Sequence, residues 1–264
     1  MAKSLPLLIA ASLMAASTLM APAASAAESE KKEASAFSKK IELAMKAESR
    51  SEKDKERDGN RMPVKTLEFF GIEEDMKVLE LIPGRGWYSR LLAPALAEKG
   101  DFYIGVGSRR VKEAKEKKEE VFQSIKIVAE DTKFSYNEEL KGTEVDNVDL
   151  QGTDYDAILT FRNYHNLTEV SRMKLNGLIL TALKPGGIYG VVDHTRRHMQ
   201  EDDNENGRRV DPVLAIKEIQ QAGFEFVDYS TLHYRPDDEL RYEVGRKTVT
   251  GNTDRFTLLF KKPM

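Results

Sequence analysis

Two glycines in the stretch Glu80-Leu-Ile-Pro83-Gly84-Arg-Gly86-Trp-Tyr88 could let a ligand approach the backbone. Glycine has no Cβ, so a ligand can lie against the main chain, and a helix that starts just beyond offers free N–H donors. A tight strand-to-helix turn without a ligand has the same composition. The stretch therefore predicts a binding loop only where a strand precedes it and a helix follows it.

A second glycine-containing stretch, Gly105-Val-Gly107-Ser108-Arg109-Arg110, comes further along the chain. Nucleotide-binding folds often place an acid roughly 20 residues past the first glycines to bind ribose hydroxyls. This chain has two arginines there instead, which either meet a phosphate or stay solvated. The cofactor-binding candidates from the two stretches are Glu80, Pro83, Gly84, Gly86, Tyr88 and Gly107.

Residues suited to proton transfer occur in two later stretches, Asn163-Tyr164-His165 and Asp193-His194. A lone histidine is often structural, but a neighbouring carboxylate can orient the ring and select its tautomer. We expect all five of these residues to be candidate catalytic residues. His198 is a further metal-ligand type, but no spacing here matches a motif such as H-E-x-x-H, so we expect no metal site.

These residues need a scaffold, and the hydrophobic pattern predicts one. Short apolar runs over 78–82, 102–106, 124–129, 155–160 and 188–192 alternate with helix-like segments, and two more runs follow at 224–229 and 255–260. Strands that alternate with helices indicate a parallel sheet with helices on both faces. No helix separates the last two strands, so they must lie antiparallel at the sheet edge. We therefore predict a doubly wound, mostly parallel seven-stranded α/β sheet with an antiparallel C-terminal edge pair.

Helices are expected over 63–71, 87–96, 108–122 and 168–183, the last one ended by Pro185-Gly-Gly187, and over 212–223. Ser108, Thr168 and Asp211 are the predicted N-caps. Residues 131–153 are polar and irregular and give no prediction. Ligands of doubly wound sheets bind beyond the carboxyl ends of the strands, which is where every candidate residue falls.

The N-terminal 27 residues have the features of a secretory signal peptide. Lys3 precedes an apolar run over 5–20, and the segment ends in small residues, so that cleavage after Ala26 or Ala27 fits equally well. This predicts a periplasmic or secreted protein. Residues 28–62 would form a polar extension with one amphipathic helix, on Ala34, Phe37, Ile41 and Ala44, and an exposed connection over 51–60. Residues 63–264 would form a single domain.

Composition excludes several classes of function. The 264 residues include no cysteine, which rules out a disulfide scaffold, a thiol nucleophile and a lipoprotein anchor. The 41 basic and 44 acidic residues are balanced, unlike the basic surplus of a nucleic-acid-binding protein. No apolar run after the signal is long enough to span a membrane. We therefore expect neither a nucleic-acid partner nor a membrane span, and the sequence does not specify an oligomeric state.

The order of these motifs resembles the class I S-adenosylmethionine-dependent methyltransferases. The resemblance lies in 78–86, in Asp156-Ala-Ile-Leu159 and in Leu183-Lys-Pro-Gly-Gly187. More narrowly, the chain resembles the exported, predicted methyltransferases of bacteria over about 57–263. The pieces that match this group are Asn163-Tyr-His165, Val192-Asp-His194, Arg209-Val-Asp211, Pro236-Asp-Asp238 and Thr253-Asp-Arg-Phe256.

This resemblance implies S-adenosylmethionine (SAM) as the cofactor, with Glu80, Gly84 and Gly86 lining its methionine end. It also implies that 163–165 face the methyl group and the acceptor, where a histidine could take the acceptor's proton. Methyl transfer is an in-line displacement at carbon, so positioning contributes much of the catalysis. Two positions depart from the common pattern: Ile82 replaces its first glycine, and Arg109 follows the second strand where an acid is usual.

Three functions agree with these observations. The leading hypothesis is a SAM-dependent methyltransferase that acts on a small molecule in the periplasm. A non-catalytic periplasmic ligand-binding protein on the same fold is the alternative, because the ribose-binding acid is missing and SAM is made in the cytoplasm. The third is an NADP-type oxidoreductase, since Gly84-x-Gly86-x-x-Ser89 followed by Ser108-Arg-Arg110 loosely fits a dinucleotide fingerprint with a 2′-phosphate reader.

Overall fold

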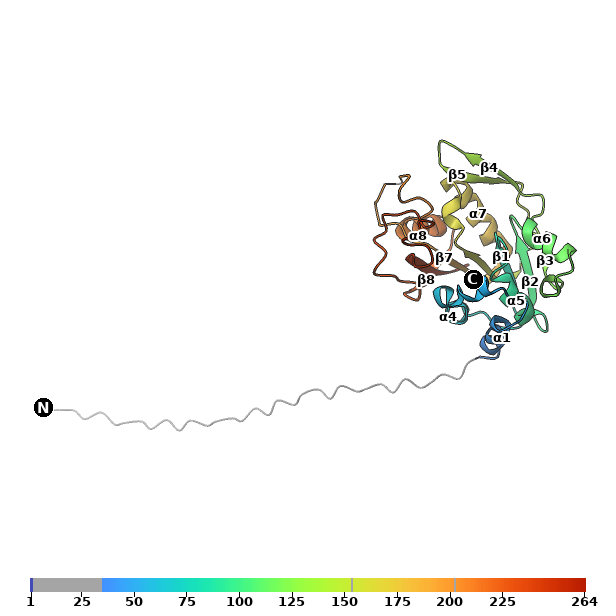
Figure 1. Ribbon diagram of the computed structural model, residues 1–264. Coiled ribbons are helices and arrows are strands. Elements are labelled where there is room, and N and C mark those ends of the chain that lie inside the picture. Colours follow the sequence, from blue (N-terminus) through green and yellow to red (C-terminus); the bar gives the residue numbers. More distant parts are fainter. Residues whose placement is uncertain (2–34, 153, 202) are drawn as a thin grey trace. The chain divides into compact units, whose positions relative to one another are not determined.

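The computed structural model describes Met1 and residues 35–152, 154–201 and 203–264 (Figure 1). Beyond Met1, the predicted signal peptide lies outside these residues, as does Ala34. The helices are α1 (Ala36–Met45), α2 (Glu52–Lys55), α3 (Asp58–Arg61), α4 (Pro63–Phe69), α5 (Ser89–Leu96), α6 (Arg109–Glu116), α7 (Glu169–Ala182) and α8 (Pro212–Gln221), with 3₁₀ turns η1 (Glu120–Phe122) and η2 (Tyr164–Asn166). The strands are β1 (Lys77–Leu81), β2 (Asp101–Gly105), β3 (Lys126–Ile127), β4 (Lys133–Asn137), β5 (Gly142–Asp146), β6 (Tyr155–Phe161), β7 (Leu183–His194), β8 (Glu225–Ser230) and β9 (Arg255–Lys261).

Seven strands form one sheet in the order β3-β2-β1-β6-β7-β9-β8. The pairs from β3 to β7 are parallel, and β9 lies antiparallel between β7 and β8. The predicted seven-stranded sheet and its antiparallel edge pair are therefore confirmed. From β1 the chain first builds the sheet outward through β2 and β3, and then returns to place β6 on the other side of β1. The strand order therefore reverses between β1 and β6, and ligands of such sheets bind at this reversal point.

Helices cover both faces of the sheet, and each face has its own hydrophobic core. Leu175, Ile179 and Ile219 of α7 and α8 pack on one face. Phe37, Leu67 and Leu91 of α1, α4 and α5 pack on the other. Figure 1 shows α1, α4 and α5 together on one side of the molecule and the β4–β5 hairpin on the opposite side. The predicted helix over 34–44 is thus α1, and its packing against α5 belongs to the second core. The domain boundary at residue 63 stays a prediction.

Two segments differ from the expectation. Residues 131–153 contain the antiparallel hairpin β4–β5, which has little hydrophobic pattern because β4 has no buried side chain. Residues 51–60, expected to be an exposed connection, contain α2 and most of α3. This segment packs against the glycine loop, because Trp87 Nε1 donates to the Asp54 carbonyl at 3.0 Å and the buried Arg50 pairs with Asp58 at 2.6 Å.

Smaller differences concern element ends. Helix α7 ends at Ala182, and β7 already begins at Leu183, so Pro185-Gly-Gly187 form an irregularity within the strand rather than a helix stop. Strand β3 is shorter than its predicted range. Thr168 and Asp211 cap their helices through side-chain oxygens as predicted, whereas Ser108 precedes α6 without such a hydrogen bond.

The parallel strands β1, β2, β3 and β6 share an unusual feature at their carboxyl ends. Each is followed, within two residues, by a non-glycine residue in the left-handed region: Ile82 (φ 52°), Val106 (φ 57°), Ala129 (φ 53°) and Arg162 (φ 64°). For a β-branched residue this conformation is a genuine outlier, and such strain costs about 1–3 kcal/mol per residue. Strain of this kind clusters at functional sites, so the strand ends are where the site is to be sought.

Candidate active site

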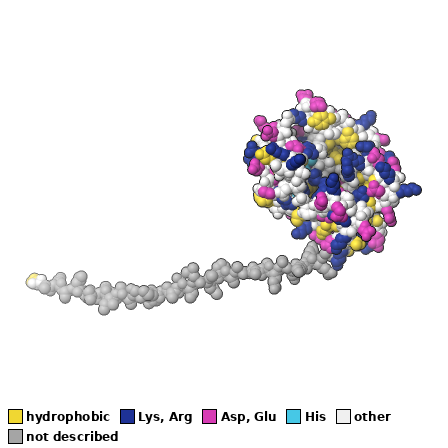
Figure 2. All heavy atoms as spheres, viewed as in Figure 1, with side chains coloured by type: hydrophobic (Ala, Val, Ile, Leu, Met, Phe, Trp, Pro, Cys, Tyr) yellow, Lys and Arg dark blue, Asp and Glu magenta, His cyan; other side chains and the backbone are white. Residues whose placement is uncertain are grey.

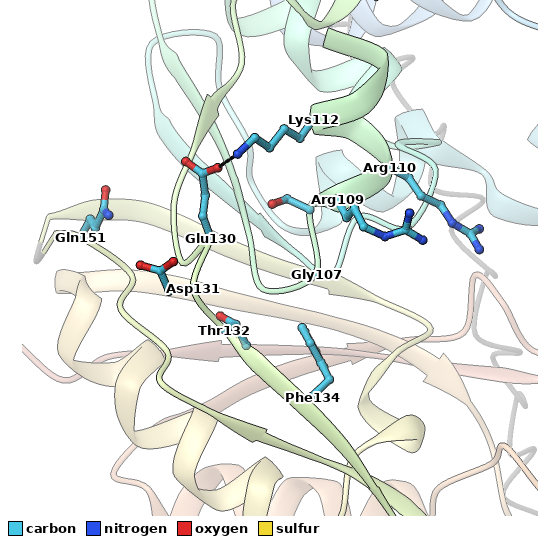
Figure 3. Close-up of a pocket in the computed structure, with 11 residues that line it drawn as sticks. Gly107, Arg109, Arg110, Lys112, Glu130, Asp131, Thr132, Phe134 and Gln151 are labelled. Atoms are coloured by element: carbon cyan, nitrogen blue, oxygen red, sulfur yellow. Dashed lines mark hydrogen bonds and ion pairs between the residues drawn. The ribbon is translucent and has the colours of Figure 1, made fainter. Parts of the chain in front are cut away.

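Three cavities open at the carboxyl ends of these strands. The largest, of about 840 Å³, lies beneath the β4–β5 hairpin, and we call it the hairpin pocket (Figure 3). Its lining consists of Gly84, Gly107, Ser108, Arg109, Arg110, Lys112, Glu130, Asp131, Thr132, Phe134 and Gln151. Figure 3 shows the residues after β3 along one side of this cavity, across from the Gly107 turn and the start of α6.

The hairpin pocket is lined both by glycine backbone, which has no side chain to block a ligand, and by carboxylate oxygens that can accept hydrogen bonds. A Cβ built on Gly84 would meet nothing within 4 Å, and one on Gly107 would lie 3.3 Å from the ring of Phe134. Phe134 is 47% exposed and offers a flat aromatic face. The Glu130 carboxylate is paired with Lys112, whereas Asp131 has no ion pair among the described residues. The pocket thus combines a stacking surface with a free carboxylate, groups that suit a planar base and hydroxyls.

Arg109 and Arg110 do not replace the missing acid. Arg109 pairs with Glu113 on its own helix at 2.7 Å. The side chains of Arg109 and Arg110 both extend away from Asp131 (Figure 3). The acids that line this pocket, Glu130 and Asp131, come from the loop after β3. A 2′-phosphate reader, as in the oxidoreductase hypothesis, would need these arginines to turn toward the ligand and Arg109 to leave Glu113.

Gly86 has a different role from the expected ligand contact. Its φ is 76°, and a Cβ there would lie 3.0 Å from the ring of Phe122 and 3.1 Å from Val111. Those residues belong to the core under α6 and η1. Gly86 therefore allows close packing of the loop against the core, while Gly84 is the glycine that faces ligand space.

A second cavity, of about 270 Å³, lies at the reversal point between β1 and β6. We call it the arginine pocket. It is lined by Asp54, Arg57, Arg61, Glu80, Ile82, Pro83, Gly84, Arg85, Trp87, Tyr88, Phe161, Arg162 and Asn163. Gly84 lines both pockets, so the two cavities adjoin at this glycine.

The arginine pocket is strongly cationic. Arg61 is only 8% exposed, lies 4.3 Å above the Trp87 ring, and its Nε has no hydrogen-bond partner. Burial, together with the charges of Arg162 and Arg57, lowers the pKa of Arg61 to about 9. Burial and the charge of Arg57 also lower the pKa of Arg162.

Glu80 is the buried acid of this pocket. Its neighbours in β1, Leu79 and Leu81, belong to the core on the α7 and α8 face, so the Glu80 side chain points to the opposite face, which α5 covers. There Ser89 Oγ, at the start of α5, donates to the Glu80 carboxylate at 2.6 Å. Burial raises the pKa of Glu80 to about 7, against the lowering effects of the Ser89 hydrogen bond and the Arg61 charge. A cationic ligand in the pocket would favour its ionised form.

Asn163, Pro83 and Tyr88 form the walls. The Asn163 amide donates to the carbonyls of Ile82 and Phe161, both at 2.9 Å, and so ties the ends of β1 and β6 together. The Tyr88 ring stacks on Phe161, and its hydroxyl donates to the Arg61 carbonyl at 3.2 Å. Burial raises the pKa of Tyr88 to about 12, so this hydroxyl stays protonated.

His165 faces a third cavity of about 370 Å³, the histidine pocket, whose lining includes Lys141, Arg196 and Arg209. Its Nδ1 donates to the buried Asp193 carboxylate at 2.5 Å, and its backbone N–H donates to the other oxygen at 2.9 Å. Its Nε2 has no hydrogen-bond partner in the described part of the chain. An Nδ1–H held by a carboxylate leaves Nε2 with a lone pair, which is the tautomer that a general base needs.

His194 is arranged in the opposite way. Arg162 Nε donates to its Nε2 at 3.0 Å, so Nδ1 carries the proton and donates to Thr253 Oγ1 at 2.9 Å. Burial and the charge of Arg162 hold the pKa of His194 well below its usual range. Both nitrogens of this neutral ring are occupied, so His194 positions Arg162 and takes no proton itself.

Tyr164 does not face any of the three pockets. Its hydroxyl donates to Glu218 at 2.6 Å and accepts from Asn176 at 3.0 Å, and Arg172 pairs with the same Glu218. This buried cluster joins α7 to α8, so the structure gives Tyr164 a structural position in place of the expected catalytic one. The structure thus divides the expected catalytic residues between a pocket wall (Asn163), a separate pocket (His165 with Asp193) and the interior (Tyr164 and His194).

Sequence reasoning missed the residues that dominate two of the pockets. Arg57 lies in the segment 51–60 expected to be an exposed connection, Arg61 directly follows that segment, and Arg162 directly precedes the candidate Asn163. Asp131 and Phe134 lie where no pattern was recognised. One signal was present in the sequence: Glu130-Asp131 directly follow a predicted strand end, where the fold places ligand contacts.

Among the described residues, no three histidine, aspartate or glutamate side chains are grouped as a metal site would need. Within the same part of the chain, every helix is too short or too polar to cross a membrane.

Comparison with known proteins places the fold. A scan with protein-family models and a search of curated proteins found no match. Among solved structures, a SAM-dependent methyltransferase from Aquifex aeolicus is similar with a TM-score of 0.54 and 18% identity, over 86% of this chain and 98% of that one. The [4+2]-cyclase SpnF is similar with a TM-score of 0.51 and 17% identity, over 78% and 81% of the two chains. With its sheet order and edge pair, the chain has the fold of the class I SAM-dependent methyltransferases.

Proposed function

We propose that the protein transfers a methyl group from SAM to a small molecule. The observation that carries this proposal is that Gly84 lines both the hairpin pocket and the arginine pocket. A ligand with a nucleoside at one end and a reactive group at the other can therefore lie across this glycine. Similar structures alone would not suffice, because the cyclase shows that this fold also carries other chemistry.

The residues present fit SAM. Phe134 offers a stacking surface for adenine, and Asp131 offers acceptors for an exocyclic amine or ribose hydroxyls. Glu80 and Asp54 suit the ammonium of the methionine end, and one guanidinium suits its carboxylate. When bound, SAM supplies an electrophilic methyl group. The chain would orient the acceptor in line with it. His165 Nε2 is the free lone pair suited to take the acceptor's proton, and this role requires the acceptor to extend from the arginine pocket to the histidine pocket.

We also propose that the protein acts outside the cytoplasm, after removal of residues 1–26 or 1–27. The small-residue end of the predicted signal supports this. Mass spectrometry of the protein recovered from a periplasmic fraction should find an N-terminus at Ala27 or Glu28. An intact Met1 on the recovered protein would refute export by this signal.

Isothermal titration calorimetry of the purified chain with SAM, S-adenosylhomocysteine (SAH) and NADPH tests the cofactor. We expect micromolar binding of SAM and SAH and none of NADPH. The Asp131→Ala variant should bind SAH about 10-fold more weakly, because a charge-assisted hydrogen bond is lost. Glu139→Ala, at an exposed acid in the turn between β4 and β5, is the control and should bind like the unmodified chain. If neither SAM nor SAH binds, the non-catalytic binding protein becomes the better hypothesis.

A further inference from the structure

The arginine pocket contains more positive charge than its own acids neutralise. Four arginines line it, against the two acids Asp54 and Glu80. These arginines are Arg57, Arg61, Arg85 and Arg162, and none forms an ion pair with a carboxylate in the described part of the chain. Figure 2 shows lysine and arginine side chains gathered around the middle of the face in view.

Arg61 is the residue that most needs a partner. It is more than nine-tenths buried, its Nε has no partner, and its guanidinium donates no hydrogen bond to any described residue. A buried charge without a counter-charge is costly, so proteins normally pair such groups. Neither acid of this pocket, Asp54 or Glu80, forms an ion pair with Arg61 among the described residues, so an anionic ligand would supply the missing counter-charge.

Arg162 is held ready for such a ligand. Its Nε donates to His194, its N–H donates to the Val192 carbonyl at 2.7 Å, and its backbone is in the left-handed region. With Nε occupied, the two terminal nitrogens remain for the pocket. A guanidinium fixed in this way loses little entropy when it binds a planar or tetrahedral anion.

The cofactor does not account for four arginines. SAM carries a sulfonium and an ammonium against a single carboxylate, so its net charge is positive and it would be repelled by a surplus of arginines. One carboxylate engages one guanidinium fork, which leaves the others without an anion. An anionic second ligand would neutralise them.

We propose that the methyl acceptor is an anion, a small molecule with a carboxylate or phosphate group that is held by Arg57, Arg61 and Arg162. This inference rests on the proposed function and specifies its substrate class. The shared chemistry is an oxyanion that accepts several N–H donors, and separate probes can distinguish the two sources of it.

The test is a titration of the chain saturated with SAH, using inorganic phosphate in one arm and acetate in the other. Chloride at matched ionic strength is the reference. We expect at least one oxyanion to raise the thermal unfolding temperature in a saturable way, with a dissociation constant in the millimolar range or below. The arm that binds more tightly identifies the group. If neither oxyanion differs from chloride, the proposal is overturned.

Variants locate the effect. Arg57→Gln should weaken the oxyanion at least 10-fold, and it should fold, because Arg57 is exposed and its side chain makes no hydrogen bond or ion pair among the described residues. Arg241→Gln removes an arginine whose side chain is 62% exposed and that lines none of the three pockets, so it is the matched control and should bind the oxyanion unchanged. Equal weakening in both variants would show a general charge effect and contradict the proposal.

The same titration separates this inference from the proposed function. If oxyanions bind only when SAH is absent, the arginines bind the carboxylate of the cofactor. In that case the inference about the acceptor fails, while the methyltransferase proposal stands. If SAH does not bind at all, the proposed function fails, and with it the assignment of any anion as a methyl acceptor.

Discussion

The hairpin pocket and the arginine pocket share Gly84 but are built from different materials. The hairpin pocket combines bare glycine backbone, one free carboxylate and an aromatic ring. The Gly107 turn and the start of α6 form one side, and the loop after β3 and the start of β4 form the other. The arginine pocket draws charged side chains from three distant segments, around Arg57, Glu80 and Arg162. The contrast teaches that one sheet edge can place a polar, nearly neutral site beside a cationic one. The first would suit the nucleoside of the cofactor, and the second would suit an anionic acceptor.

The largest expected effect tests whether His165 in the histidine pocket takes the proton of an acceptor that is held in the arginine pocket. Replacing His165 by Asn removes the free Nε2, and we expect turnover to fall about 10²–10⁴-fold, as for the loss of a general base. SAH affinity should not change. Transfer of tritiated methyl groups from SAM into a small-molecule extract measures turnover.

His198→Asn is the matched control for this variant, because the side chain of His198 is 57% exposed and pairs with the N-cap residue Asp211. It should retain full turnover. Equal turnover in the two variants would place the proton acceptor outside the histidine pocket.

The next effect concerns Glu80, the buried acid of the arginine pocket. Its pKa is about 7 in the folded chain against an ordinary value of 4.5, so between these values the folded state holds a proton that the unfolded state releases. The free energy of unfolding should therefore fall as pH rises through this window, by about 3 kcal/mol in total. Urea unfolding at several values between pH 4.5 and 8 measures it.

Glu80→Gln cannot titrate and should flatten this dependence, whereas Glu138→Gln, on an exposed acid, should leave it intact. Bound SAM should also reduce the fall, because a cationic ligand favours the ionised carboxylate. A slope that persists unchanged in Glu80→Gln would assign the titration to another group.

A smaller effect separates the two glycines of the loop. Gly86→Ala places a methyl group 3.0 Å from Phe122 at a positive φ, so we expect a loss of about 1–3 kcal/mol in stability with SAH affinity retained once folded. Gly84→Ala meets open space and should cost only about 1 kcal/mol, from its φ of 61°. It should instead weaken SAH, because the new methyl group faces both pockets. Calorimetry of both variants would reveal the reverse pattern if Gly86 were the ligand contact.

The smallest effect tests the stacking surface. Phe134→Ala should weaken SAH about fivefold, or about 1 kcal/mol, through loss of an aromatic contact in the hairpin pocket. Oxyanion binding in the arginine pocket should stay the same. Tyr136→Ala, two positions along the same strand and 59% exposed, is the control and should bind SAH normally. Equal weakening by both would indicate a general effect on the hairpin.

The sequence by itself determined the fold class, because hydrophobic periodicity is a local property and each buried strand and helix shows it. It also located most site candidates at strand ends, including Glu80, Gly84, Gly107 and His165. It could not predict the β4–β5 hairpin, since β4 is exposed and has no buried face to produce a pattern.

Only the tertiary structure decided which strand-end residues share a cavity. Asn163 bonds to Ile82 across 81 positions of the chain, and Arg57 reaches the same pocket from a segment with a solvated composition. His165 and Asn163 are two residues apart, yet they line different pockets. The physical reason is that hydrophobic periodicity shows only which face of a helix or strand is buried. A binding site depends on side chains from distant segments, and backbone turns such as those at Ile82 and Arg162 decide where these side chains point.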